Sequence, residues 1–240
     1  MHPRDCEWWE YKKHPHRTAV PIRCEKILNE LEQGGLDIGR CLRDTRPQHA
    51  EIFINLTPAN QPYLAGNYRG GKGRCLRYLE VRVEGDKRVG SPPARVAADM
   101  ANFNGSLLGR GLKALEEAFA IPDVKLPPAE KLNYVVKFSC RLLVQFLRIH
   151  PYANGNGHIG RLIVWFIMAR FGYWPREWPL DGHPPYDELL SMYRDGDEQP
   201  LEDFVHMAID GTVSKPAPRS PATDASSDSN ITAVGRLSSP

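Results

Sequence analysis

The sequence lacks any long apolar run. Its longest, Leu162–Ala169, is far shorter than the roughly 20 apolar residues that a membrane-spanning helix needs. Residues 1–7 are charged and lack the apolar centre of a secretory signal. We therefore expect no membrane partner, no export by a classical signal, and a cytoplasmic location, although a translocated effector would have the same features.

The chain also lacks an excess of charge of either sign. It carries 31 Lys and Arg against 29 Asp and Glu, a formal net charge of +2. Such a balance gives no general attraction to anionic polymers, so nucleic acid is not expected as a partner. Any strongly positive region must be local.

Paired cysteine motifs are absent. The five cysteines, Cys6, Cys24, Cys41, Cys75 and Cys140, form no C-x-x-C pair and no spacing typical of zinc. We expect no structural metal site. Any scheme of intramolecular pairing leaves one cysteine over, which favours reduced thiols.

What the sequence does contain is helical periodicity. Apolar residues recur every three or four positions between Pro128 and Ile149, which predicts an amphipathic helix. A nearly uniform apolar stretch follows and predicts a buried helix from Asn156 to Phe171. Further helices are predicted over residues 22–31, 47–54, 94–103, 107–119, 186–194 and 201–209. The predicted fold class is mainly α: a helical domain over residues 22–212, an N-terminal arm over 1–21 and a disordered C-terminal tail over 213–240.

A histidine and a glycine-rich loop join the two central helices. The segment from His150 to Arg161 reads HPYANGNGHIGR. A helix N-terminus has unpaired N–H groups and the positive end of a dipole, and glycine lets an anion approach the backbone closely. Asn156 is expected to cap the second helix through its side-chain oxygen. The segment predicts a base, His150, beside a phosphate-binding loop.

This segment resembles the active-site signature of the Fic (Fic/DOC) family, H-x-F-x-(D or E)-G-N-G-R-x-x-R. The leading histidine, the Gly-Asn-Gly triplet and the final arginine match at His150, residues 155–157 and Arg161, and Tyr152 replaces the phenylalanine. The resemblance implies a helical bundle with a small β-hairpin flap. It also implies transfer of AMP from ATP to a Ser, Thr or Tyr hydroxyl of a target protein.

The same resemblance implies a role for each matching residue. His150 is the expected catalytic base, Gly155, Asn156 and Gly157 hold the phosphates, and Arg161 lies near the leaving pyrophosphate. The implied cofactor is Mg²⁺, with ATP as co-substrate. A separate inhibitor or antitoxin is a further expected partner, because the family's inhibitory motif has no clear copy here.

Two positions depart from the family pattern. Asn154 stands where an acidic metal ligand is usual, and its neutral oxygen predicts weak Mg²⁺ binding. His158 stands where the first arginine is usual, so the expected nucleotide site has less positive charge.

A second segment supports the same interpretation. A glycine-rich basic stretch, residues 66–74, precedes alternating apolar and charged residues that predict a short strand. Fic proteins are similar in carrying a Gly-x-Tyr-Arg-like stretch and a hairpin flap before the catalytic loop, and the flap pairs with the target by strand addition. We expect the flap within about residues 66–93. Its target-binding residues are predicted to be Leu76, Tyr78, Leu79 and Val81.

Other interpretations stay open at this point. The same scaffold is compatible with transfer of another phosphate-containing group, such as a phosphoryl, phosphocholine or UMP group, because Asn154 and His158 adjoin the phosphates. A catalytically weak nucleotide-binding interaction module is a third class. Taken alone, His150 reads as a capping residue and the basic stretch as a surface loop. The combination of histidine, glycine loop and arginine favours the enzyme.

Overall fold

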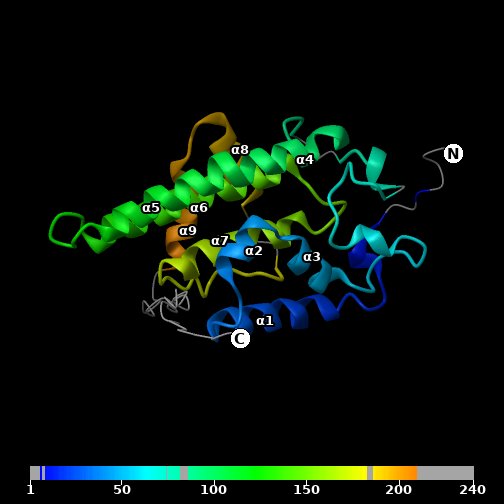
Figure 1. The fold of residues 1–240 in the computed structure, drawn as a ribbon, viewed down its shortest axis with the longest axis horizontal. Coiled ribbons are helices and arrows are strands. Elements are labelled where there is room, and N and C mark those ends of the chain that lie inside the picture. Colours follow the sequence, from blue (N-terminus) through cyan, green and yellow to red (C-terminus); the bar gives the residue numbers. More distant parts are fainter. Residues whose placement is uncertain (1–5, 7–8, 74, 82–85, 183–185, 210–240) are drawn as a thin grey trace, which may run out of the picture.

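A computed structural model describes residue 6 and residues 9–73, 75–81, 86–182 and 186–209. The described part is mainly helical, which confirms the predicted fold class (Figure 1). None of its helices is both long and apolar enough to cross a membrane. The predicted tail, 213–240, lies outside the described residues.

The predicted helices are present, with ends shifted by a few residues. They are α1 (Ala19–Glu32), α3 (Arg46–Phe53), α4 (Pro93–Asn102), α5 (Arg110–Ala120), α6 (Pro128–Ile149), α7 (Asn156–Arg170), α8 (Asp187–Asp195) and α9 (Gln199–Met207). A six-residue helix, α2 (Ile38–Arg43), was not predicted. Its sequence signal is the N-cap Asp37, whose carboxylate accepts a hydrogen bond from the Arg40 N–H at 2.9 Å.

Helices α6 and α7 form the centre of the molecule (Figure 1). Nearly every residue of α7 is buried, as its uniformly apolar sequence predicts. The two helices approach closely at Gly160, where an added Cβ would lie 2.9 Å from Leu143 Cδ1. Helix α1 packs on α3, α2 on α7, and α9 on α6 and α8.

Helices α4 and α5 are joined rather than separated. The sequence Asn104-Gly105-Ser106 predicts a break, but residues Phe103–Gly109 form a π-helical segment that continues α4 into α5. The amide of Asn104 donates to the Arg43 carbonyl at 2.8 Å, so a tertiary contact holds the segment.

The predicted hairpin flap does not appear in the described residues. Residues 82–85 lie outside them, and Leu76–Tyr78 form a 3₁₀ turn, η4, instead of a strand. The carbonyls that a strand would use are already bonded: Leu76 O accepts from Gly70 N, and Leu79 O accepts from Arg69 Nη1. Tertiary contacts therefore hold the start of the predicted flap, and the rest of the alternating pattern lies outside the described residues.

Arg69 organises this region from inside the protein. Its side chain is 1% exposed, and its other bonds run to the carbonyls of Ser91, Ile149 and His150. Burial lowers the pKa of its guanidinium to about 10. Taken alone, the basic stretch predicts a surface loop, but Arg69 is buried because its guanidinium donates to backbone carbonyls around the end of α6.

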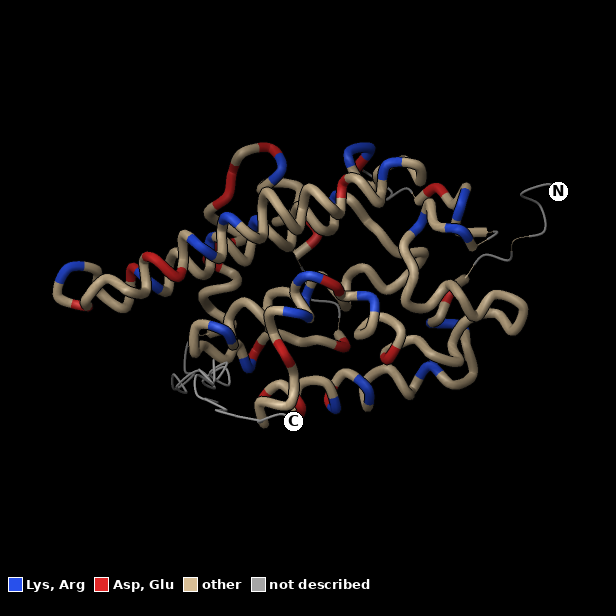
Figure 2. Tube along the Cα trace, in the orientation of Figure 1, with Lys and Arg blue, Asp and Glu red and all other residues tan. Residues whose placement is uncertain are grey.

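Charges are distributed evenly over the fold. Lys and Arg are interspersed with Asp and Glu along the trace, and no face has one sign in this view (Figure 2). This distribution agrees with the balanced composition.

Candidate active site

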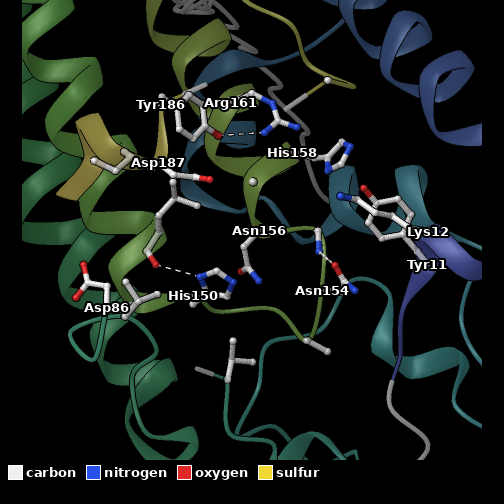
Figure 3. Close-up of a pocket in the computed structure, with 18 of the residues that line it drawn as sticks. Tyr11, Lys12, Asp86, His150, Asn154, Asn156, His158, Arg161, Tyr186 and Asp187 are labelled. Carbon is white, nitrogen blue, oxygen red and sulfur yellow. Dashed lines mark hydrogen bonds between the residues drawn. The ribbon is translucent and has the colours of Figure 1, made fainter. Parts of the chain in front are cut away.

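One cavity of about 760 Å³ contains the residues of the predicted site. Its lining includes His150, Asn154, Gly155, Asn156, Gly157, His158 and Arg161, together with Val81 from the predicted flap (Figure 3). The other predicted flap residues lie elsewhere. Leu76 is 1% exposed and belongs to the core, so it cannot contact a target, whereas Tyr78 is 65% exposed and Leu79 is partly buried against the core.

His150 ends helix α6 in a left-handed conformation, with φ of 54°. Its Nδ1 lies 3.1 Å from the Leu147 carbonyl, a contact in which Nδ1–H donates. That tautomer leaves the Nε2 lone pair available to accept a proton. Desolvation lowers the pKa of the imidazole to about 4. The bond to Leu147 opposes this shift, and the nearby charges of Arg69 and Arg194 add to it. His150 is therefore neutral at physiological pH, as a general base must be.

The loop after His150 leads into α7 through Gly155. This residue has φ of 77°, and an added Cβ would lie 2.2 Å from Phe53 Cε2, so glycine is required for both conformation and space. The first helical bond of α7 runs from Ile159 N to Gly155 O. The N–H groups of residues 156–158 therefore precede any helical acceptor, and these residues line the cavity.

Side chains from distant segments fix the shape of this loop. His49 accepts the Gly66 N–H at Nδ1 and therefore donates from Nε2 to the Asn154 carbonyl at 2.9 Å. Asn156 does not cap α7 as expected. Its amide bonds both the N–H and the carbonyl of Tyr152, because the loop turns its side chain inward. The loop is thus held in shape before any ligand binds.

Asn154 does not fit a magnesium ligand in this arrangement. Its Oδ1 accepts the Gly155 N–H at 2.7 Å, and its Nδ2 donates to the Trp9 carbonyl at 2.9 Å. Both ends of the amide therefore have partners within the protein, and the oxygen is neutral, whereas protein sites for Mg²⁺ usually include one or two carboxylates. No group of three His, Cys, Asp or Glu suited to a metal occurs among the residues described.

Arg161 and His158 form the far side of the cavity. The Arg161 guanidinium is 1% exposed, donates to the Leu180 carbonyl and the Tyr186 hydroxyl, and lies against the glycine loop, where a Cβ on Gly157 would be 3.1 Å from Nη1. Burial, with help from the Arg161 and Lys12 charges, lowers the pKa of His158 to about 3. His158 is therefore uncharged, and its buried Nε2 has no partner among the described residues.

The N-terminal arm supplies cavity residues that the sequence did not predict. Tyr11 packs edge-on to His158, and Lys12, next to it, faces the cavity (Figure 3). The Lys12 ammonium forms no ion pair with a described carboxylate. Carboxylates also line the cavity, and one of them, Asp86, is paired with Arg88 and Arg194. No sequence signal marks Lys12, since an isolated surface lysine is common.

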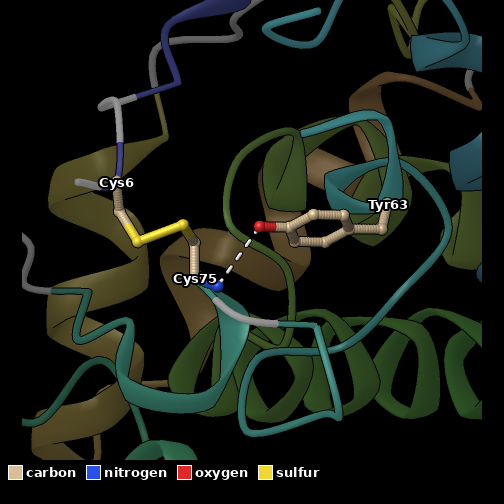
Figure 4. The surroundings of a disulfide bond; sticks show 3 residues. All are labelled: Cys6, Tyr63 and Cys75. Atoms are coloured by element: carbon tan, nitrogen blue, oxygen red, sulfur yellow. Dashed lines mark hydrogen bonds between the residues drawn. A yellow bond between two sulfur atoms is a disulfide. The ribbon is translucent and has the colours of Figure 1, made fainter. Parts of the chain in front are cut away.

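A disulfide between Cys6 and Cys75 ties this arm to the start of η4 (Figure 4). The expectation that all thiols are reduced is therefore wrong. Two of the five cysteines form this bridge, and the other three, Cys24, Cys41 and Cys140, are buried free thiols. The two half-cystines are 69 residues apart, so spacing alone did not reveal the pair. Trp9 adds a second anchor, because it is buried and its Nε1 donates to the Leu56 carbonyl at 2.7 Å.

Comparison with known proteins agrees with the motif. A model of the Fic/DOC family matches residues 60–168. The chain is 25% identical over 137 residues to the protein adenylyltransferase Fic of Nematostella vectensis, which covers 57% of this chain and 28% of that protein. Proteins of the same name from Drosophila virilis and Aedes aegypti are 27% identical over 78 and 82 residues, or 32% and 34% of this chain.

The aligned regions make up only 16% to 28% of the length of these relatives. The similarity is therefore to one part of longer proteins. It includes the loop that joins α6 to α7, since the family match runs through most of α7. The resemblance to the Fic/DOC family that the motif predicts is thereby confirmed over residues 60–168.

Proposed function

We propose that this protein is a protein adenylyltransferase that transfers AMP from ATP to a Ser, Thr or Tyr hydroxyl of a target protein. The observation that carries the proposal is the convergence of three groups on one cavity: the His150 imidazole, the N-terminal N–H groups of α7 and the Arg161 guanidinium. The volume of about 760 Å³ is in the range of small-molecule sites.

The reaction needs a base and a place for negative charge. His150 Nε2 accepts the proton of the target hydroxyl as its oxygen forms a bond to the α-phosphorus. The bond between that phosphorus and the α,β-bridging oxygen breaks, and pyrophosphate leaves with the electron pair. A well-placed base contributes about 10² to 10⁴ in rate.

The remaining cavity groups position the phosphates. The N–H groups of residues 156–158 bind phosphate oxygens at the positive end of the α7 dipole. Arg161 and Lys12 stabilise the departing pyrophosphate, and Lys12 supplies charge that the neutral His158 does not. Mg²⁺ stays a prediction for the ATP complex, and no step above depends on Asn154 as its ligand.

The test uses labelled nucleotide and a base-deficient variant. The full chain is incubated with a cell lysate, Mg²⁺ and ATP labelled at the α- or the γ-phosphate, beside His150→Ala and the exposed-residue control His16→Ala. We expect covalent label from α-labelled ATP only, lost in His150→Ala and retained in His16→Ala. Omission of Mg²⁺ in a parallel reaction, with Asn154→Asp beside the parent, reports on the metal.

The same assay separates the other interpretations. Label from the γ-phosphate alone indicates phosphoryl transfer. UMP and phosphocholine do not come from ATP, so parallel reactions with UTP and with a phosphocholine donor, followed by mass spectrometry of the modified protein, distinguish these groups from AMP by the added mass. ATP binding without any transfer indicates an interaction module. Label that survives in His150→Ala contradicts the base assignment.

A further inference from the structure

A second cavity, of about 920 Å³, adjoins the candidate active site. It lies between the π-helical segment after α4, one face of α6 and the end of α8, and its lining includes Phe103, Leu107 and Tyr193. Arg194 lines both cavities. The two cavities therefore share a wall, and Leu147 faces one while its neighbour Arg148 faces the other. We call this second cavity the basic groove.

The basic groove is lined by cations and aromatic rings. Helix α6 contributes Lys137, Arg141 and Arg148. They are spaced four and seven residues apart, so they share one face of the helix. Arg141 and Arg148 are exposed and form no ion pair with a described carboxylate. Tyr134, 44% exposed, and Phe138 lie on the same face. Glu198 is the acidic residue of the lining.

The shared wall is a network of ion pairs. Asp86 accepts from Arg88 and from Arg194 at 2.9 Å each, and Arg88 also reaches Asp195. The Arg194 side chain is only 10% exposed, and its Nε has no hydrogen-bond partner among the described residues. Arg88 and Arg194 are therefore already paired with carboxylates of this protein. The groove's attraction for an anion therefore comes from α6.

We propose that the basic groove binds an acidic segment of the target protein, with apolar or aromatic side chains among its carboxylates. This inference rests on the proposed function. The hydroxyl to be modified would lie in the first cavity, and the acidic segment of the same target would extend over the shared wall into the basic groove. Charge complementarity supports this occupant, because carboxylates pair with the arginines that lack partners in the described fold. The aromatic side chains favour a peptide that also buries apolar surface.

The chain's own C-terminal segment is not complementary to the groove. Residues 210–240 carry three acidic residues, Asp210, Asp224 and Asp228, and three basic ones, Lys215, Arg219 and Arg236. Continuity with the candidate active site instead points to the molecule whose hydroxyl is modified. The proposal therefore defines a substrate class: proteins with an acidic stretch close in sequence to the modified residue.

The test measures binding apart from transfer. Fluorescence anisotropy follows a labelled peptide of Glu and Asp with interspersed Leu and Phe, a matched peptide with Lys in place of the acids, and a single-stranded oligonucleotide. The full chain is compared with Arg141→Glu/Arg148→Glu and with the control Arg110→Glu/Lys125→Glu, which reverses two exposed charges outside both cavities. Thermal melting establishes that each variant is folded.

We expect the acidic peptide to bind, with an affinity that falls as salt is added. Arg141→Glu/Arg148→Glu should weaken it by about tenfold or more, as expected for reversal of two charges that contact the ligand, while Arg141→Lys/Arg148→Lys retains most of the affinity. The control variant should bind as the parent does. Nucleotide binding should be unchanged in all of them.

Three results would overturn the inference: no binding of the acidic peptide, an equal loss in the control variant, or preference for the oligonucleotide. These outcomes are separable from failure of the proposed function. Transfer to lysate proteins without peptide binding removes only the groove proposal. If the peptide binds and the Arg141→Glu/Arg148→Glu variant weakens it, but no nucleotide is transferred, the proposed activity is contradicted. The groove then still binds acidic protein partners.

Discussion

His150 combines a fixed tautomer with a lowered pKa. The Leu147 carbonyl holds Nδ1–H, and desolvation keeps the ring neutral. A base with a low pKa is always in its active form near pH 7, at the cost of weaker proton affinity. Bound phosphates add negative charge beside the ring, which raises the pKa in the nucleotide complex relative to the free enzyme.

This difference predicts the pH profile of transfer. The group is active when deprotonated, so activity is lost as pH falls through its pKa. We expect the acid limb of kcat/KM, which reports the free enzyme, to fall near pH 4, below the ordinary histidine value of 6.5. The limb of kcat should lie at higher pH than that of kcat/KM. Steady-state transfer across the pH range measures both, and an acid limb of kcat/KM at 6.5 would contradict the desolvated site.

Lys12 is the residue whose role is most easily isolated. It lines the cavity, whereas the adjacent Lys13 does not, so the two form a matched pair. We expect Lys12→Gln to raise the KM for ATP by about fivefold, the loss of roughly 1 kcal/mol typical of a partly exposed charged contact. The KM for ATP in Lys13→Gln should equal that of the parent. Equal effects of both substitutions would show that only the general positive charge of the arm matters.

At the scale of elements, the sequence predicts best what is local. The segment from α6 through the glycine loop to α7 follows from helical periodicity and glycine positions, all within a few turns. The predicted residues of this segment, from His150 to Arg161, meet in one cavity. The prediction for Asn156 is wrong because its side chain binds two backbone groups of Tyr152 instead of capping α7. Only the folded loop brings these groups within reach.

The flap and the arm show where local reasoning ends. The alternation around Leu79 and Val81 predicts a strand, but the buried Arg69 takes the carbonyl of Leu79 from ten residues away. Lys12 reaches the cavity because Trp9, Tyr11 and the Cys6–Cys75 bridge fix the arm, and each of these contacts joins distant parts of the sequence. No periodicity or spacing encodes such pairings.

On the proposed function, the disulfide therefore links the arm to the nucleotide site. We expect reduction, or Cys6→Ser, to lower stability by roughly 2–4 kcal/mol, because the bridge closes a long loop. The Kd for ATP should rise on reduction, because the segment that carries Lys12 loosens. In the Lys12→Gln variant, reduction should change the Kd for ATP little. Calorimetry and nucleotide titration with and without reductant measure both effects. Cys6→Ser itself is the control, since its melting temperature should not respond to reductant.

At the scale of the whole molecule, three histidines with a lowered pKa, His49, His150 and His158, tie stability to pH. His49 stacks on Tyr152 and braces the loop, and His158 is wedged between Tyr11 and Phe53. Burial lowers the pKa of each of these two rings to about 3, and that of His150 to about 4, from the ordinary 6.5. All three rings are neutral in the fold across the mildly acid range, whereas in the unfolded chain they take up protons below 6.5.

The unfolded state therefore binds more protons than the native state between pH 6.5 and about 3, and the free energy of unfolding falls as pH is lowered through this window. Well below 6.5, each ring contributes a slope of about 1.4 kcal/mol per pH unit. Urea unfolding between about pH 7 and 5, above the range where carboxylates titrate, should reveal the combined slope. His158→Phe keeps an aromatic ring in place and removes the titration of one of the three rings, so its slope should be about two thirds that of the parent. The exposed His16→Gln should match the parent, and an unchanged slope in His158→Phe would mean that His158 is hydrated and able to take up a proton within the native fold.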